Sequence, residues 1–90
     1  MTASITIVGT LGPKIDELTR EVHVRRFYEA ELKEQHLDVF RAVNWNHRPN
    51  AILYQAKEET PVAIIGRLEN DDQGFPIIIV EQLSFLNSIH

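Results

Sequence analysis

The sequence predicts an all-β fold with one short helix, in which five strands close a barrel and the helix lies between strands three and four. The main observation is the stretch 60–86, TPVAIIGRLENDDQGFPIIIVEQLSFL. Residues 62–68 and 76–83 are rich in β-branched side chains, and 69–74 between them are typical turn residues. Successive Ile and Val over 77–80 indicate strands that are apolar on both faces. A covered barrel explains this; the alternative is a buried hairpin in an α+β domain.

Length and composition narrow the class of protein. Ninety residues predict one domain, 1–90. There is no cysteine, so disulfides and thiolate sites are excluded, and nothing indicates secretion. We find no signal-peptide pattern and no apolar run near the ~20 residues of a membrane span, and therefore expect a soluble cytoplasmic protein. The net charge of −4 argues against strong generic attraction to nucleic acid, although local clusters matter more than totals.

The N-terminal half predicts three strands, over residues 4–11, 20–32 and 37–45. The first has Gly9, which permits a sharp bend in a small barrel, and Gly12-Pro13 is expected to end it. A helix over 27–37 is the rival for the end of the second strand, since that stretch contains good helix formers. With a turn at 33–35, pairing Leu32 with His36 would place Phe27 opposite Arg41 and His23 opposite Trp45, although no glycine marks this register.

Residues 46–59 predict the helix, with Asn46 as N-cap and Pro49 in its first turn. Ile52, Leu53 and Ala56 form its apolar stripe, and Thr60-Pro61 ends it. In the fourth strand, Gly66 predicts a barrel bend or a close approach of two backbones. A helix between strands three and four of five is the arrangement of an OB-fold barrel.

Four stretches resemble bacterial single-stranded DNA-binding proteins. Residues 5–12 (ITIVGTLG) look like their first strand, and 40–46 (FRAVNWN) look like their third, where an aromatic precedes the helix. Residues 62–68 (VAIIGRL) are similar to their fourth strand with its Gly-Arg-Leu ending, and 74–86 look like their fifth. The resemblance covers nearly the whole chain. It implies an OB-fold protein that binds single-stranded DNA in DNA replication.

The chain also departs from that family. It is shorter than a typical member, and its connector over 69–73 is compact and acidic where the family has a longer, more basic loop. The sequence ends at His90, without the glycine-rich linker and acidic tip through which family members recruit replication proteins. We therefore expect a short variant that lacks the acidic C-terminal tail.

Binding of single strands requires cations along the phosphates and aromatic faces on which bases stack. The second and third strands offer both, and the predicted nucleic-acid-binding residues are His23, Arg25, Phe27, Arg41 and Trp45. By the resemblance, Trp45 matches the family's stacking aromatic and Arg41 a basic residue of the same strand. Alternatively, Trp45 and Phe27 belong to the core or a subunit interface. The arginines would then pair with Glu29, Glu31 or Asp38.

Other chemistry is not indicated. The four histidines, His23, His36, His47 and His90, lack metal-ligand spacing, and the acidic turn lacks the alternating ligands of a calcium loop. No nucleophile, phosphate-loop or acid/base motif occurs, so we expect no enzyme activity, cofactor or metal. Two functions remain open. The first is a single-stranded DNA-binding protein, and the alternative is an OB-fold protein-interaction module with little or no nucleic-acid affinity.

A small barrel with exposed strand edges predicts self-association. The first strand is apolar or β-branched on both faces, and one face must line the barrel. We expect a homo-dimer with Thr6 and Val8 near the contact, and a tetramer as an extension. The resemblance implies the same, because the family assembles through dimers and commonly tetramers. The alternative is a monomer whose first strand is covered by its own connector over 14–19.

Overall fold

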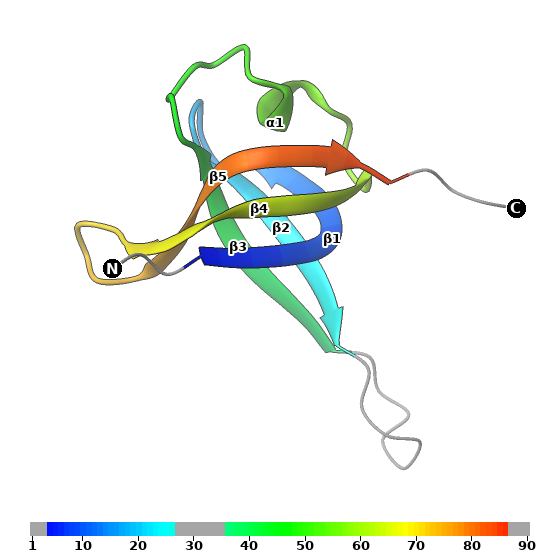
Figure 1. The fold of residues 1–90 in the computed structure, drawn as a ribbon, viewed down its shortest axis with the longest axis horizontal. Helices are drawn as coiled ribbons and strands as arrows, with labels where there is room; N and C mark the ends of the chain where they lie inside the picture. The colour runs from blue at the N-terminus through cyan, green and yellow to red at the C-terminus, as the bar shows by residue number, and fades with distance from the viewer. Residues whose placement is uncertain (1–3, 27–35, 87–90) are drawn as a thin grey trace, which may run out of the picture.

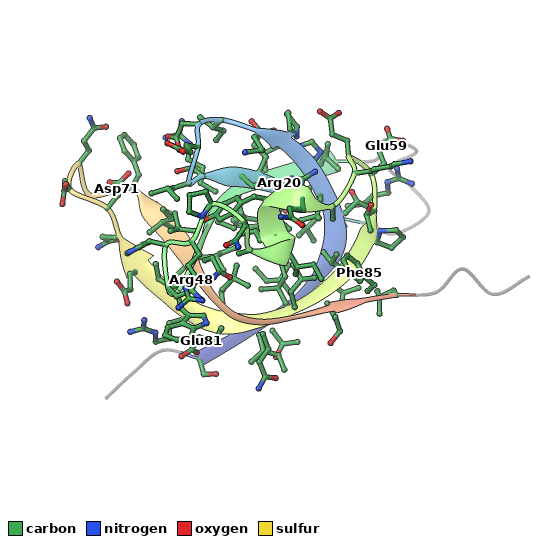
Figure 2. The ribbon with its side chains drawn as sticks, turned by 90° about the horizontal axis from the view of Figure 1, so that it is seen from above. Arg20, Arg48, Glu59, Asp71, Glu81 and Phe85 are labelled. Atoms are coloured by element: carbon green, nitrogen blue, oxygen red, sulfur yellow. The ribbon has the colours of Figure 1, made fainter. Side chains whose placement is uncertain are left out.

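The computed structural model describes residues 4–26 and 36–86. Its elements are β1 (Ser4–Lys14), β2 (Arg20–Arg26), β3 (His36–Asn44), α1 (Ile52–Gln55), β4 (Pro61–Asn70) and β5 (Pro76–Phe85). The strands close a barrel in the order β1-β2-β3-β5-β4 (Figure 1). Seen from above, α1 lies over one open end of that barrel (Figure 2). The predicted five-stranded OB-fold barrel with a short helix between strands three and four is confirmed.

Strand pairing is antiparallel except at one seam. There β3 and β5 run parallel, from Ala42 opposite Ile78 to Asn44 opposite Val80. The backbone N–H of Trp45 extends this seam by donating to the carbonyl of Val80, 3.0 Å away. The seam closes the barrel. It also fixes the backbone of Trp45 at the end of β3.

The core lies inside the barrel and under α1. Alternate residues of each strand point inward, as the period of two along a strand requires. Leu53 and Tyr54 from α1 close the end of the core. The buried apolar residues are Leu11, Val22, Ala42, Leu53, Tyr54, Val62, Ile64, Ile78 and Val80.

Arg20 is a buried cation that ties β1 and α1 together. Its side chain is only 2% exposed. The Nε atom donates to the carbonyl of Gly12 at 2.8 Å, and Nη1 donates to the carbonyls of Leu53, at 2.9 Å, and Ala56. Burial lowers the pKa of Arg20, and the charge of Glu58 acts against this. The guanidinium satisfies carbonyls at the end of α1 that the short helix leaves without partners.

The helix is much shorter than expected. The predicted helix over 46–59 is wrong outside Ile52–Gln55, and Ala51, not Asn46, occupies the N-cap without a side-chain bond. The Asn46 side chain instead accepts hydrogen bonds from the Asn44 side chain and the Arg48 backbone. His47 has a φ of 52°, which is incompatible with a right-handed α-helix. A local turn therefore replaces the first helical turns.

Two further expectations about the strands are corrected. β1 does not end at Gly12-Pro13 but continues to Lys14, with a register irregularity against β2 after Leu11. The expected register of β2 and β3 is wrong as well. Arg41 pairs with Glu21, and His23 pairs with Val39. The expected extension of the second strand to residue 32, the turn at 33–35 and the rival helix lie largely outside the described residues.

Gly66 lies where β4 and β5 shift register, between Ile65 and Gly66. A Cβ atom at Gly66 would overlap with the carbonyl oxygen of Ile79. The expected close approach of two backbones at this glycine is confirmed. The irregularity bends the strand pair where the barrel curves, which is a common role of a bulge.

Candidate nucleic-acid interface

The outer face of β2 and β3 carries the predicted site residues that the structure describes. The observed register places Arg25 opposite Leu37 and His23 opposite Val39. Leu37 and Val39 are both exposed, Val39 to 52%. Large apolar side chains on an open sheet face, flanked by cations, form a surface suited to flat, partly apolar ligands such as bases.

Arg25 and Arg41 are exposed on this face. Neither makes an ion pair with a carboxylate in the part of the chain that the structure describes. Asp38, one of the expected alternative partners, pairs with Val24 in the ladder and so belongs to the other face of the hairpin. The other two, Glu29 and Glu31, lie outside the described residues. Two guanidinium groups on one face thus have the freedom to meet phosphates.

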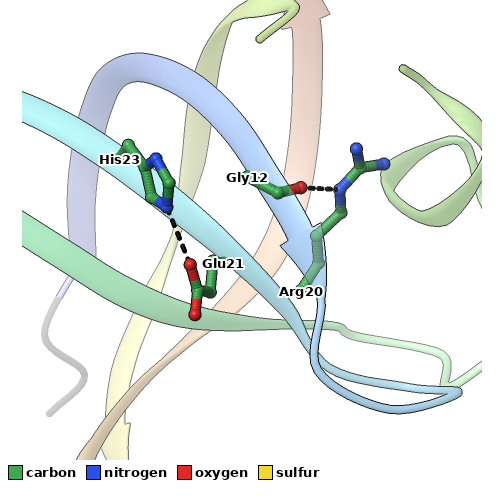
Figure 3. Close-up of polar contacts among 4 residues, drawn as sticks. All are labelled: Gly12, Arg20, Glu21 and His23. Atoms are coloured by element: carbon green, nitrogen blue, oxygen red, sulfur yellow. Dashed lines mark hydrogen bonds and ion pairs between the residues drawn. The ribbon is translucent and has the colours of Figure 1, made fainter. Parts of the chain in front are cut away.

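His23 is held within the protein. Its Nε2 atom lies 2.8 Å from Oε1 of Glu21 (Figure 3). The ring also lies against Gly12, where a Cβ atom would overlap with it. The side chain is only partly exposed. His23 shares the face with Arg25 and Arg41, but its outer nitrogen is already engaged by a carboxylate.

Trp45 follows the end of β3 on the same outward parity as Arg41 and Val43. Its side chain is 59% exposed, so the alternative that it belongs to the core is wrong. Its place in a subunit interface stays an alternative prediction. Trp45 lies beyond the paired part of β2, so the expected pairing with His23 does not occur. Phe27, the second expected stacking residue, lies outside the described residues.

Sequence reasoning missed Phe75. This side chain is also 59% exposed, at the start of β5. An open pocket of about 390 Å³ lies between it and β3. The pocket is lined by Val39, Phe40, Arg41, Gln73, Phe75 and Pro76. The sequence does show an aromatic residue between Gly74 and Pro76. It follows the predicted turn directly and was not interpreted as a binding residue.

Arg41 also borders an acidic pocket of about 330 Å³. Asp16, Asp71 and Asp72 line this second pocket. The pKa of Asp16 is lowered, chiefly by the backbone N–H of Leu18 and to a lesser degree by the charge of Arg41. Arg41 therefore separates a largely apolar pocket from an anionic one, and a phosphate is favoured only on the apolar side.

Among the described residues, no group of three or more His, Cys, Asp or Glu side chains is placed to hold a metal ion. Within the same residues, no helix has the length and apolar character needed to cross a membrane.

Comparison with known proteins places the fold. No protein-family model matches the sequence. No curated protein matches it either. Among solved structures, the chain is similar to a small single-stranded DNA-binding protein from Streptomyces coelicolor, with a TM-score of 0.66 and 17% sequence identity. The alignment covers 94% of this chain and 93% of that chain, so the likeness extends over the whole barrel.

Proposed function

We propose that the protein binds single-stranded DNA on the outer face of β2 and β3. Bases stack on Trp45, and Arg25 and Arg41 contact the phosphates. The observation that carries the proposal is the large exposed indole on the same face as two arginines without ion-pair partners among the described residues. The similar solved structure, named as a small single-stranded DNA-binding protein, supports it.

The chemistry is that of binding without sequence readout. A base that stacks on Trp45 contributes about 1–3 kcal/mol, whatever its identity. Each phosphate neutralised by Arg25 or Arg41 releases counterions, so affinity falls as salt rises. The overall charge of −4 opposes the approach of a polyanion, and we expect modest affinity for this reason.

His23 and Phe27 complete the proposed interface. Because the Nε2 atom of His23 is hydrogen-bonded to the Oε1 atom of Glu21, we assign His23 a supporting role between Arg25 and Arg41. Phe27 follows β2 in the chain, and we propose it as a second stacking residue.

Tryptophan fluorescence tests the proposal directly, because Trp45 is the one tryptophan of the chain. We expect an oligothymidylate to quench it, with an affinity that declines steeply with salt. Trp45→Ala should weaken binding by about 1–3 kcal/mol with an unchanged melting temperature, whereas Trp45→Phe should retain much of the affinity. Absence of both quenching and a mobility shift at low salt would refute DNA binding and favour the protein-interaction module. The exposed Leu37 and Val39 would suit that second function.

We propose in addition that the protein forms a homo-dimer at least, through the outer face of β1. Thr6 pairs with Ile65 of β4, and Val8 pairs with Ala63. On this face Thr6, Val8 and Ile65 are exposed, Val8 to 59%. A semi-apolar patch of two adjacent strands is a surface that a two-fold partner would cover, and a tetramer would extend the same assembly.

A further inference from the structure

The turn between β4 and β5 is organised by one carboxylate. Oδ1 of Asp71 accepts hydrogen bonds from the backbone N–H groups of Gln73 and Phe75, both at 2.9 Å. The backbone of Asp71 also donates to the carbonyl of Phe75, at 2.8 Å, and accepts from Gly74 at 3.0 Å. Gly74 has a φ of 87°, which suits glycine. These hydrogen bonds hold Phe75 at the end of the turn, and they engage only the Oδ1 atom of the Asp71 carboxylate.

The turn leaves the apolar ring of Phe75 exposed to water. Phe75 is followed by Pro76, whose fixed φ further restricts the chain. Exposing a phenyl ring costs free energy that burial elsewhere would avoid. Phe75 and Val39 stand at the pocket between β5 and β3, with Arg41 and Gln73 as its polar groups. A fixed aromatic beside a cation is the pairing that single-stranded nucleic acids use.

We propose that this pocket receives one unpaired nucleobase, stacked on Phe75, with Arg41 on the adjoining phosphate. This inference rests on the proposed function and extends it. Phenylalanine has no hydrogen-bonding group, so stacking on it accepts any base, while the Gln73 amide can both donate and accept at a base edge. The pocket therefore adds affinity with little sequence preference.

Charge complementarity favours a phosphate on only one side of Arg41. On the far side of Arg41 the walls are Asp16, Asp71 and Asp72, which repel phosphates. On the near side, β3 leads from Val39 to Leu37, which pairs with Arg25. The phosphate next to the base on Phe75 is therefore expected on the side of Arg41 that faces Val39, away from these carboxylates.

The test compares binding of the full-length chain to two probes. One is an oligothymidylate, and the other is a deoxyribose-phosphate oligomer of the same length without bases. We expect Phe75→Ala to weaken oligothymidylate binding about tenfold and to leave binding of the baseless oligomer unchanged. Phe75→Leu, which keeps an apolar side chain in the turn, should show most of the same loss. Phe85→Leu, an exposed phenylalanine at the other end of β5, is the matched control and should bind as wild type.

Tryptophan fluorescence can report on the pocket directly if an indole is introduced at position 75. In a Trp45→Phe, Phe75→Trp double variant, fluorescence reports position 75 alone, and oligothymidylate should quench it.

Three outcomes would refute the proposal that this pocket binds a nucleobase. Wild-type affinity in Phe75→Ala, with Trp45→Ala impaired, would remove the pocket and leave the proposed function intact. Equal losses for both probes would show that Phe75 acts through the backbone of the turn and not by stacking. A Phe75→Ala variant with full DNA affinity but a smaller mass in solution would assign the pocket to a second copy of the chain. Failure of the wild-type protein to bind either probe would refute the proposed function itself.

Discussion

The guanidinium of Arg67 lies 2.9 Å from the carboxylate of Glu69, two residues further along β4. Its Nε atom lies 3.6 Å from Oε2 of Glu81 on β5. Arg67 pairs with Ile79 in the ladder, and Ile79 pairs with Val43 of β3, so this acidic cluster adjoins the proposed interface. One cation here meets two anions, and Arg67 is a poor candidate for a phosphate contact.

Glu81→Gln should therefore strengthen DNA binding. Glu81 follows Val80, whose carbonyl accepts from the Trp45 N–H. Removing its negative charge should raise affinity for oligothymidylate about two- to threefold at low salt, and less at high salt. The measurement is a fluorescence titration at two salt concentrations. Glu59→Gln removes an exposed charge near the other side of the barrel (Figure 2) and is the control. Equal affinities for Glu81→Gln and wild type at low salt would show that the strand does not pass this cluster.

Arg20→Met should destabilise the fold by about 3 kcal/mol or more, because buried carbonyls lose their donor at about 1–3 kcal/mol each. The carbonyls affected are those of Gly12, Leu53 and Ala56. Urea unfolding measures the change. Arg25→Met, at an exposed position, should stay within about 0.5 kcal/mol of wild type. An Arg20→Met protein as stable as wild type would mean that α1 does not depend on this cation.

Gly66→Val should lower the melting temperature markedly. Its Cβ would overlap with the carbonyl oxygen of Ile79, and relief requires a backbone shift that costs about 1–3 kcal/mol. Gly74→Asn is the matched control. Gly74 has open space around it, and asparagine tolerates its positive φ. Thermal unfolding of the two variants should separate them clearly, and similar melting temperatures would contradict the close approach.

Tyr54 should make stability fall at high pH. Burial raises the pKa of its phenol above the ordinary value, and the hydroxyl donates to Leu18 and accepts from the backbone N–H of Asn44. The folded state therefore holds this proton more tightly than the unfolded chain, whose tyrosine titrates near pH 10. The stabilisation is complete below about pH 10 and is lost as pH rises through the higher folded pKa.

Urea unfolding of wild type and Tyr54→Phe at two pH values tests this. At pH ~8 the variant should be about 1–3 kcal/mol less stable, since the Asn44 N–H and the Leu18 carbonyl, both partly buried, lose a partner. The gap should narrow above about pH 10, where the wild type alone pays for ionising a buried phenol. A gap that is constant across pH would contradict the raised pKa.

Val8→Lys should convert the proposed dimer into a monomer. A charge in the centre of the β1–β4 patch would have to be desolvated on association. Light scattering at micromolar concentration should give a multiple of the 10.4 kDa chain mass for wild type. A wild-type mass of one chain would refute the assembly. A dimer that persists in Val8→Lys would move the interface away from Thr6 and Val8.

Sequence patterns predicted the barrel well because its strands alternate strongly and its breakers are glycine and proline. The predicted helix was too long, because Asn46 and Pro49 are residues that commonly begin a helix. The chain instead forms a turn in which the His47 N–H donates to the Asn44 carbonyl, and His47 has a positive φ. Arg20 was assigned only as the start of a strand. Its burial depends on carbonyls from α1, more than thirty residues away, and no local pattern reports such a partner.

Part of the proposed DNA-binding site was predicted correctly because the error in the expected β2–β3 register is an even number of residues. The register of β2 and β3 was wrong by six positions, since Arg41 faces Glu21 where Phe27 was expected. Six is even, so each side chain stayed on its expected face, and Arg25, Arg41 and His23 do share one surface. The position of Phe75 beside β3 and the hydrogen bond between His23 and Glu21 depend on the tertiary structure. The spacing of residues along the chain does not predict them.

The parallel seam between β3 and β5 has a kinetic consequence. Its three residue pairs join parts of the chain separated by α1 and all of β4, so neither partner can find the other locally. Loop closure must come first, and folds dominated by such distant pairings form in about milliseconds to seconds. During that time β3 and β5 both present open edges, from which strand-to-strand aggregation starts. The yield of folded protein should therefore depend on how quickly residues 42–44 reach residues 78–80, more than on the final stability of the barrel.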